Sequence, residues 1–475
     1  MAKKAAEKSA KELSEMLLNP RKNGFFKVTD EKIEKADKFC EGYKAFLNSA
    51  KTERESVEYA VAAAEKHGFV PFDPKHKYAA GDKVYYNNRG KAICLAIMGK
   101  EGCKNGVRIA AAHIDNPRLD LKPIPLYESS EMAYLKTHYY GGIKKYQWTA
   151  IPLAMHGVVV KSDGTVIKVC IGEEAGDPQF TITDILPHLG QDQATKPLGT
   201  AFTGEDLNIL IGSRPVRDEE AKDAYKLNIM RLLNEKYGIV EADLISAEIE
   251  FVPAFKAVDI GFDRSLVGAY GHDDRVCAYA SVNAILSIDE TPEYTCCCLL
   301  ADKEEIGSVG ATGMHGKYFE NAVAELVNAT GEYSDLLVRR ALTACRMLSC
   351  DVSAGYDPNF AGVFERKNAA YLGRGVCFNK YTGSGGKGGS NDANAEYMGK
   401  LRRLMDDANV NFQTAELGKV DQGGGGTIAY ICANYGMEVI DSGVAVLSMH
   451  APWEIISKAD LYEAVKAYHA FMLKA

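Results

Sequence analysis

The chain has 475 residues, of which 46% are hydrophobic and 25% are charged, and its formal net charge is -8. Such a chain can bury a large core and has room for two or three domains, which excludes a disordered protein. The acidic excess is spread along the chain and excludes a general nucleic-acid binder, whose affinity rests on clustered Lys and Arg.

Two helices are predicted near the N-terminus. Thr29, followed by two acidic residues, has the pattern of a helix start, and apolar residues recur on one face as far as Leu47. Thr52 and Glu55 have the spacing of a capping box for a second helix, which Gly68 is expected to end. Short apolar runs then predict strands at 84–86, 92–98 and 107–112.

The segment 123–252 has the pattern of antiparallel strands. The turn Asp163-Gly164 joins the apolar runs 158–160 and 165–169, and apolar residues alternate from Ile245 to Phe251. One helix is expected in this segment, at 219–237.

Beyond Phe262, apolar strands alternate with amphipathic helices, and Ser457 and Asp460 are expected to cap the last helix. We therefore predict an α/β domain formed by residues 1–122 and 253–475, with a β-rich domain of residues 123–252 inserted into it.

The cysteines and the N-terminus indicate a cytoplasmic protein. The twelve Cys form no CxxC pair, so we interpret them as reduced thiols of the core in a reducing compartment. No apolar run approaches the roughly 18 residues that span a bilayer, which predicts no membrane partner. Residues Met1 to Leu18 mix Lys with Glu, unlike a secretion signal, and form either a surface helix or a packing arm.

Four apolar, strand-like runs each end on side chains that can bind metal ions. His113 follows the run 107–112, and Asp302, Glu304 and Glu305 follow the run 296–301. Asp351 follows the run 346–350, and His450 follows the run 444–449. Ligands of open α/β sheets bind outside the carboxyl ends of the strands, so we expect these side chains to converge. Asp273 is a fifth candidate, because it stands just before the helical run 276–288.

This donor set of imidazoles and carboxylates suits Zn, Mn or Co and is large enough for two ions that share a carboxylate. Each residue also has an ordinary explanation: His113 as a structural histidine, Glu304 and Glu305 as a solvated acidic pair, Asp273 as a helix cap and Asp351 as a turn residue. Their joint placement at strand ends favours the metal site over four separate coincidences.

Six motifs carry a resemblance to one family of peptidases. They are Ala112-His113-Ile114-Asp115, Gly271-His272-Asp273-Asp274, Asp302 to Ser308, Cys350-Asp351-Val352, Gly423 to Ala429, and Met449-His450-Ala451. With them, nearly the whole chain resembles the aspartyl aminopeptidase or aminopeptidase I family of dinuclear metallopeptidases. The resemblance implies a mixed-sheet, three-layer, zinc-peptidase-like catalytic domain with an inserted β-rich dimerisation domain.

The resemblance also implies a ligand set for two metal ions per chain. Asp273 would bridge the ions, His113 and Asp351 would complete one site, and Glu305 and His450 would complete the other. Zn²⁺ is the first expectation, and Mn²⁺ and Co²⁺ are alternatives because they accept the same donors.

Glu304 is implied to be the general base. In such enzymes the base takes a proton from metal-bound water, the hydroxide attacks the scissile carbonyl, and the base returns the proton to the leaving amine. Asp115 follows His113 by two residues, so in an extended chain both side chains point to one side, and we expect the carboxylate of Asp115 to hold the second imidazole nitrogen. The alternative for Asp115 is a turn residue before Pro117.

Members of this family form hollow tetrahedral dodecamers from dimers and admit only peptides. The resemblance therefore implies a homo-oligomer of this kind that acts on peptides with a free N-terminus. The segment 140–157 resembles the family's interface segment, although Thr149 to Pro152 replaces its charged residues. In some members a histidine of the neighbouring subunit reaches the active site, and the candidates here are His138, His156 and His188.

The preferred N-terminal residue stays open between acidic and broad. An acidic side chain needs a cation at the pocket floor, but Cys377 stands where a Lys is expected, with Lys380 and Lys387 as weak substitutes. The glycines 423–426 lack the Lys and Ser/Thr of a phosphate-binding loop, so a close backbone approach to substrate is expected there.

The sequence predicts a metallo-aminopeptidase, with two alternatives. One is a dinuclear amidohydrolase or dipeptidase that acts on acylated amino acids or dipeptides. The other is a metal-free, non-catalytic scaffold that only assembles into a shell, which the presence of all five proposed ligands and the base argues against.

Overall fold

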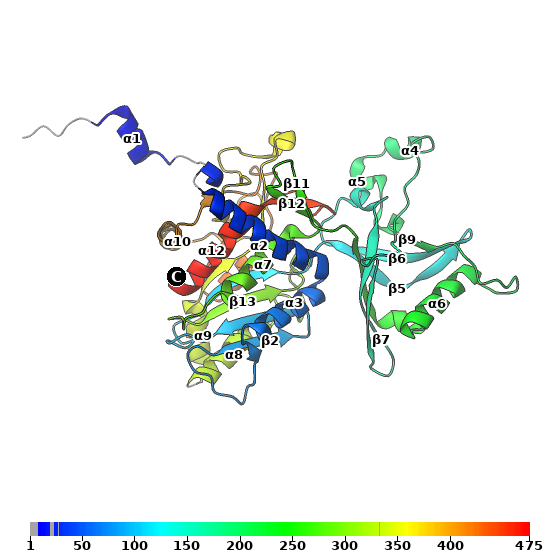
Figure 1. The fold of residues 1–475 in the computed structure, drawn as a ribbon, viewed down its shortest axis with the longest axis horizontal. Helices are drawn as coiled ribbons and strands as arrows, with labels where there is room; N and C mark the ends of the chain where they lie inside the picture. Colours follow the sequence, from blue (N-terminus) through cyan, green and yellow to red (C-terminus); the bar gives the residue numbers. More distant parts are fainter. Residues whose placement is uncertain (1–7, 20–22, 27, 332) are drawn as a thin grey trace, which may run out of the picture.

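The computed structural model describes residues 8–19, 23–26, 28–331 and 333–475. Its fold is mixed α/β with three sheets, the largest of which lies between two layers of helices (Figure 1). The expected three-layer α/β architecture is thereby confirmed.

The central sheet has nine strands. In spatial order they are β1 (Val70–Pro71), β2 (Lys83–Asn88), β3 (Ala92–Ile97), β13 (Cys296–Ala301), β4 (Arg108–His113), β14 (Arg346–Ser349), β18 (Glu438–Gly443), β16 (Val376–Asn379) and β17 (Phe412–Thr414). β4 pairs in parallel with both β13 and β14, and every residue of β4 and β13 is buried. Strands covered on both faces need continuous apolar runs, which is why runs of this kind predict them.

Helices cover both faces of this sheet. One face carries α2 (Asp30–Ser49), α3 (Glu53–Lys66), α7 (His272–Leu286), α10 (Ala395–Asp407) and α12 (Lys458–Lys474). The other carries α8 (Tyr318–Thr330), α9 (Asp335–Ala344) and α11 (Ala429–Ala433). Successive residues of β4 alternate between the two cores, because side chains of a strand point to opposite faces.

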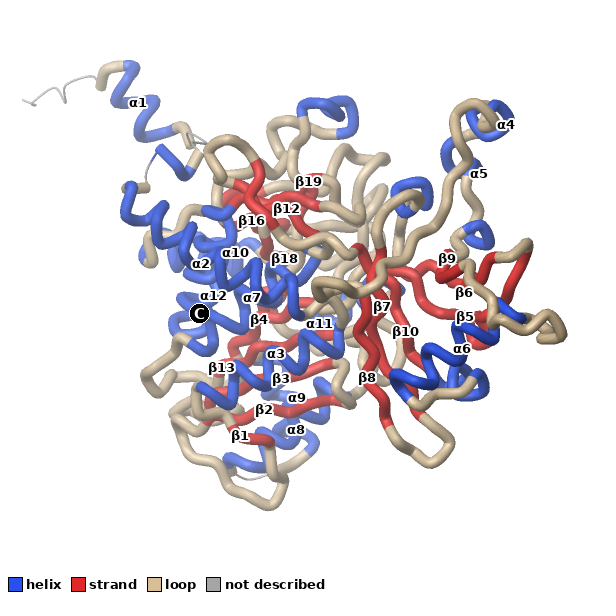
Figure 2. Tube along the Cα trace, turned by 45° about the vertical axis from the view of Figure 1, so that its right-hand side comes forward, coloured by secondary structure: helices blue, strands red, loops and turns tan. Residues whose placement is uncertain are grey.

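The central sheet and the helices on its two faces form the central body. A six-stranded sheet stands to one side of this central body (Figures 1 and 2). Its order is β8 (Val166–Ile171), β7 (Leu153–Val160), β10 (Ala247–Pro253), β5 (Arg118–Ser129), β6 (Met132–Tyr140) and β9 (Ile209–Gly212), with α4 (Gln191–Ala194), α5 (Leu198–Ala201) and α6 (Ala224–Tyr237) between strands. Its pairings are antiparallel and it has a separate core around Trp148 and Phe251. The sheet thus spans Arg118 to Pro253, and the domain division at 123 and 252 stays a prediction.

The third sheet has five short strands: β11 (Val258–Ile260), β12 (Leu266–Ala269), β20 (Glu454–Ser457), β19 (Ala445–Leu447) and β15 (Ser353–Ala354). The described residues also form six 3-10 helices: η1 (Gly24–Phe26), η2 (Lys145–Trp148), η3 (Gly204–Asp206), η4 (Glu241–Ser246), η5 (Glu304–Ile306) and η6 (Pro358–Val363).

Local sequence patterns give several helix ends correctly. The capping box of Thr52 and Glu55 is formed, and Gly68 follows α3 with φ +83°. The helix expected at 219–237 begins at Ala224, because Asp223 has left-handed backbone angles that end the preceding turn.

The last helix begins where expected, but the prediction that the side chains of Ser457 and Asp460 cap it is wrong. Ser457 stands at the N-cap of α12, but its side chain makes no capping bond. The carboxylate of Asp460 instead accepts the N–H groups of Gly373 (2.7 Å) and Gly375 (2.6 Å), so it holds a neighbouring loop. Thr29 likewise precedes α2 without a side-chain capping bond.

The N-terminal segment contains a surface helix. Residues Ala10–Leu17 form α1, which a capping box of Ser9 and Glu12 opens, and none of its residues is buried. The first seven residues of the predicted segment lie outside the described part of the chain. Among the described residues, no helix has both the length and the apolar character that crossing a bilayer requires.

Candidate active site

Three neighbouring parallel strands of the central sheet place candidate ligands at their carboxyl ends. β4 ends on His113, the turn after β13 holds Glu304 and Glu305, and Asp351 follows β14. Strand order alone brings these side chains to one edge, as ligand sites of open sheets require.

His450 reaches the same place from a different sheet. The run 444–449 forms a strand only as β19, which belongs to the five-stranded sheet, so the expectation of one common sheet is wrong for this run. His450 itself lies in the following turn with φ +64°. Its side chain therefore depends on how the two sheets pack.

The carboxylate of Asp273 lies between the two histidines. Its Oδ1 is 3.2 Å from Nε2 of His113, and its Oδ2 is 3.1 Å from Nε2 of His450. Asp273 is buried in the first turn of α7, where its backbone angles are not helical. A carboxylate with one oxygen directed to each imidazole has the arrangement of a bridging ligand.

The remaining candidates lie beside one or both histidines. Nε2 of His113 is 3.9 Å from Asp351 Oδ1 and 3.9 Å from Glu304 Oε2. Nε2 of His450 is 3.5 Å from Glu305 Oε2. The structure therefore brings together all five proposed ligands and the proposed base.

Asp115 orients the turn that holds the two glutamates. Its carboxylate accepts the main-chain N–H groups of Glu304 and Glu305, both at 3.1 Å, and the hydroxyl of Tyr140 at 2.8 Å. Nδ1 of His113 is 3.0 Å from the main-chain carbonyl of Asp115 and 3.4 Å from its carboxylate. The expected contact thus runs mainly through the carbonyl, because the N–H groups of the turn engage the carboxylate.

Three residues near the ligands were not identified from the sequence. Glu454, buried on β20, accepts the N–H of Asp273 at 3.0 Å with one oxygen and that of His450 at 2.6 Å with the other. Asn116 donates to the carbonyl of Asp273, and Asp274 has a ligand atom within 4.8 Å of those of His113 and Asp351. Glu454 is the first residue of the short strand β20, where no local pattern in the sequence marked it.

The negative charges of the carboxylates in this site are not fully compensated by the two histidines. Burial raises the pKa of Glu304 to about 7 and raises the pKa values of Glu305 and Asp351 well above normal. Burial would also raise the pKa of Asp273, but hydrogen bonds with His113 and His450 lower it. A raised pKa of a carboxyl group away from water indicates that no nearby positive charge compensates its ionised form. Divalent metal ions would supply this positive charge.

One ligand atom also lacks a hydrogen-bond partner. Oε1 of Glu305 is buried and, among the described residues, accepts no hydrogen bond. Because buried polar atoms are normally satisfied, an unpartnered carboxylate oxygen beside imidazole nitrogens fits a metal ligand.

A cavity of about 500 Å³ opens beside these residues. Its lining comprises Gly142, Asp273, Glu304, Glu305, Gly307, Ser308, Asp351, Val352, Asn379, Thr382, Leu417, Gly424, Gly425, Gly426, Thr427, Tyr430, Met449 and His450. No Lys or Arg contributes to this lining. Lys380 and Lys387 pair instead with Asp392, at 3.5 and 2.9 Å, and Cys377 is buried.

Comparisons with known proteins identify the family to which the chain belongs. The family described as aminopeptidase I zinc metalloprotease (M18) matches residues 46–472. The probable M18 family aminopeptidase 1 of Clostridium acetobutylicum is 54% identical over 460 residues, which are 96% of this chain and 99% of that protein.

Solved structures extend the similarity to the fold. The crystal structure of an M18 family aminopeptidase from Thermotoga maritima has a TM-score of 0.91 and 44% identity, over 96% of this chain and all of that chain. The S. cerevisiae mApe1 dodecamer has a TM-score of 0.74 at 21% identity, over 93% of this chain and 97% of that chain, which shows a common fold.

These findings confirm the resemblance that the motifs indicated. Family and relatives match nearly the whole chain, and the relative from C. acetobutylicum is named as an aminopeptidase. The chain therefore belongs to the aminopeptidase I zinc metalloproteases (M18) and is a hydrolase of the aminopeptidase class.

Proposed function

We propose that the chain is an aminopeptidase that uses two divalent metal ions to hydrolyse the first peptide bond of peptides. The observation that carries this proposal is the carboxylate of Asp273, which directs one oxygen to His113 and the other to His450. His113 and Asp351 would hold one ion, Glu305 and His450 the other, and Asp273 both. Two Zn²⁺ ions, or Mn²⁺ or Co²⁺ in their place, would supply Lewis acidity to a carbonyl oxygen and to water.

Glu304 is proposed to move the proton. Its side chain lines the cavity, and burial raises its pKa to about 7, a value suited to both accepting and donating a proton at neutral pH. Oε2 of Glu304 would take a proton from the attacking water and deliver it to the nitrogen of the leaving amine. Asp115 would act as a positioning residue, because its carboxylate holds the main-chain N–H of Glu304.

The cavity favours neutral N-terminal side chains. Asn379, Thr382, Leu417, Tyr430 and Met449 line it, and no cation among the described lining residues is available to pair with Asp or Glu. A substrate panel of aminoacyl chromogenic compounds is expected to give a higher kcat/KM for Leu than for Asp, Glu or Lys. A kcat/KM highest for Asp or Glu would contradict this preference.

The assembly is proposed to be a homo-oligomer, with a dimer-based dodecamer as its form. The fold shared with the S. cerevisiae mApe1 dodecamer supports this form. The six-stranded sheet, separate from the central body, is the proposed dimerisation element. A cytoplasmic location stays part of the proposal.

The requirement for a free amine separates this function from its alternatives. A tripeptide amide is expected to lose its N-terminal residue, whereas the same peptide acetylated at its N-terminus is expected to resist. Hydrolysis of the acetylated form would indicate an amidohydrolase, and cleavage of dipeptides alone would indicate a dipeptidase. Elemental analysis that finds fewer than one transition-metal ion per chain after reconstitution would favour the scaffold.

A further inference from the structure

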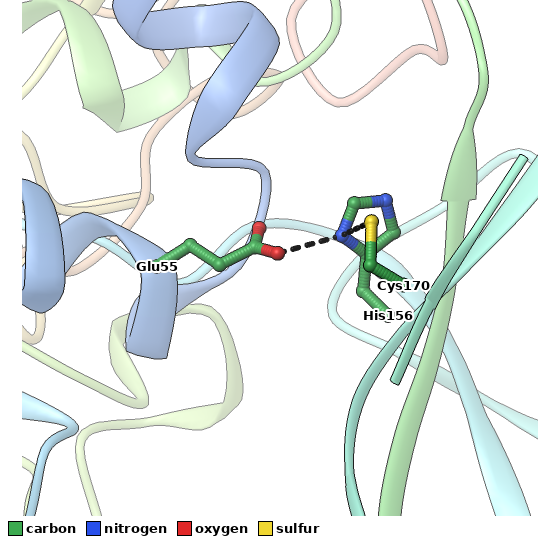
Figure 3. Close-up of side chains that lie close together, drawn as sticks. All are labelled: Glu55, His156 and Cys170. Atoms are coloured by element: carbon green, nitrogen blue, oxygen red, sulfur yellow. Dashed lines mark hydrogen bonds and ion pairs between the residues drawn. The ribbon is translucent and has the colours of Figure 1, made fainter. Parts of the chain in front are cut away.

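A second group of metal-ligand side chains lies between the central body and the six-stranded sheet. Glu55 of α3, His156 of β7 and Cys170 of β8 point toward one another (Figure 3), and their ligand atoms lie within 4.8 Å of one another. Nδ1 of His156 is 2.8 Å from Glu55 Oε1 and 3.9 Å from Cys170 Sγ. None of the three contributes to the proposed active site.

The carboxylate of Glu55 is already oriented. Its Oε2 accepts the N–H groups of Lys51 (2.9 Å) and Thr52 (3.1 Å) at the start of α3. Its Oε1 is thereby left directed at His156. A ligand held by the capping box of a helix loses little conformational entropy when it binds an ion.

The imidazole of His156 is oriented from its other side. Nε2 is 3.1 Å from Oε1 of Glu173, and Glu173 forms ion pairs with Lys51 at 2.6 Å and Lys256 at 2.7 Å. Histidines that bind metal ions almost always donate their second N–H to a carboxylate or carbonyl oxygen. Glu173 therefore occupies the position expected of the group that supports a histidine ligand.

We propose that Glu55 Oε1, His156 Nδ1 and Cys170 Sγ bind one further divalent ion, of the class to which Zn²⁺ and Co²⁺ belong. Carboxylate, imidazole and thiolate together suit these borderline ions, whereas Ca²⁺ and Mg²⁺ require oxygen ligands. Three protein ligands leave a fourth position for water.

Binding would exchange protons for the ion. Nδ1 of His156 lies 2.8 Å from Glu55 Oε1, so in the ion-free protein a proton occupies the hydrogen bond between these two atoms. The ion would displace that proton from Nδ1 and a second proton from the Cys170 thiol. A divalent cation that replaces two protons leaves the net charge of this cluster unchanged, so no uncompensated charge is created.

The ion has access to the site and would join two parts of the chain. A cavity of about 440 Å³ between α3 and the hairpin of β7 and β8 has Glu55 in its lining, and Cys170 is exposed. The three ligands come from both sides of the boundary between the central body and the six-stranded sheet. Ion binding would therefore stabilise the contact between these two parts.

Cobalt distinguishes this site from the proposed active site. A thiolate bound to Co²⁺ gives a near-ultraviolet charge-transfer band, and none of the proposed active-site ligands is a cysteine. Titration of the metal-free full chain with Co²⁺ is expected to load three ions per chain and to produce this band. Cys170→Ser should lose the band and the third ion but keep peptidase activity.

Two further variants make the outcome decisive. Cys170→Asp should restore the third ion without the band, because a carboxylate replaces the thiolate, and Asp351→Asn should keep the band although an active-site ligand is altered. A parent protein without the band, or a Cys170→Ser variant with the parent's band, would overturn the proposal and leave an ion pair of His156 with Glu55 and Glu173. The Cys170→Ser variant assigns the band to this site, and none of the proposed active-site ligands is a cysteine, so the result is independent of the proposed two-metal function.

Discussion

Two glutamates of the proposed active site, the half-buried Glu304 and the buried Glu454, have different tasks. Glu304 lines the cavity and approaches His113, whereas Glu454 is not among the lining residues and accepts the N–H groups of Asp273 and His450. The first is positioned to act on substrate, and the second acts only through the residues that it holds.

Replacement of Glu304 by Gln is expected to lower kcat by about 10²- to 10⁴-fold, the usual effect of removing a proton-transfer group. Metal content should stay at the parent level, because the amide keeps the size of the side chain and all five proposed ligands are intact. Steady-state kinetics and elemental analysis of the same preparation check both expectations. A kcat within tenfold of the parent would exclude Glu304 as the base.

Replacement of Glu454 by Gln is expected to weaken metal binding by about 10- to 100-fold, as loss of groups that orient ligands usually does. The amide has only one acceptor oxygen, so one of the two N–H groups loses its partner. Titration of the metal-free chain with Zn²⁺ measures the change, and the exposed Glu396→Gln on α10 is the matched control. Equal affinity in parent and Glu454→Gln would show that the two N–H bonds do not position the ligands.

At the level of elements, ion pairs join α3 to the six-stranded sheet. Arg118 of β5 is buried against Glu53 of α3 (3.2 Å), Glu250 of β10 (3.4 Å) and Asp120 (2.8 Å), with its guanidinium over the ring of Tyr140. Burial alone would raise the pKa of Glu53, but the charges of Arg118 and Lys91 lower it to about 2. The positive charge of the Arg118 guanidinium therefore compensates the negative charges of carboxylates from both α3 and the six-stranded sheet.

Arg118→Met is expected to lower the free energy of unfolding by about 3–5 kcal/mol at neutral pH, because it leaves buried carboxylates uncompensated. The folded-state pKa of Glu53 lies below its usual value of 4.5, so its contribution is present above pH 4.5 and is lost as the pH falls toward 2. Urea unfolding at pH 7 and pH 3.5 should therefore show a smaller difference between variant and parent at the lower pH.

A double variant tests whether the pair itself causes this loss. Arg118→Met with Glu53→Gln should cost less than the sum of the two single variants, since each removes the partner of the other. Additive losses would mean that Arg118 stabilises the boundary by packing and not by charge.

At the scale of the whole molecule, the segment that carries α4 and α5 exposes apolar side chains. Leu189 is 71% exposed and Leu198 62%, with Ile185 and Leu186 also exposed nearby. Figure 1 shows this segment projecting above the six-stranded sheet. Exposed apolar groups of this kind mark contact surfaces, and we expect this one to contact another copy of the chain.

Leu189→Asp is expected to reduce the mass of the assembly measured by light scattering, because a charge would replace an apolar side chain whose burial contributes about 1.5–3 kcal/mol per copy. The circular dichroism spectrum should stay unchanged, since Leu189 packs little within its own chain. Leu336→Asp on α9, at a residue 55% exposed on the central body, is the control. An assembly of parental mass in Leu189→Asp would remove this segment from the interface.

Local patterns in the sequence determine much of the fold. The capping box at Thr52 and Glu55, the antiparallel hairpin around Asp163-Gly164 and the buried strands 107–112 and 296–301 follow from short-range rules of spacing and burial. These strands end on the residues that face the proposed active site, so the sequence also predicts most of its candidate ligands, with roles taken from the family resemblance.

Only the tertiary structure decides how distant segments meet. It brings His450 from a second sheet to Asp273, sets Glu454 behind both, and assigns the carboxylate of Asp115 to the main-chain N–H groups of Glu304 and Glu305. The cluster of Glu55, His156 and Cys170 depends in the same way on the packing of α3 against β7 and β8. Periodicity and spacing act over a few residues, whereas most of these contacts join residues 100 or more positions apart and depend on how sheets and helices pack.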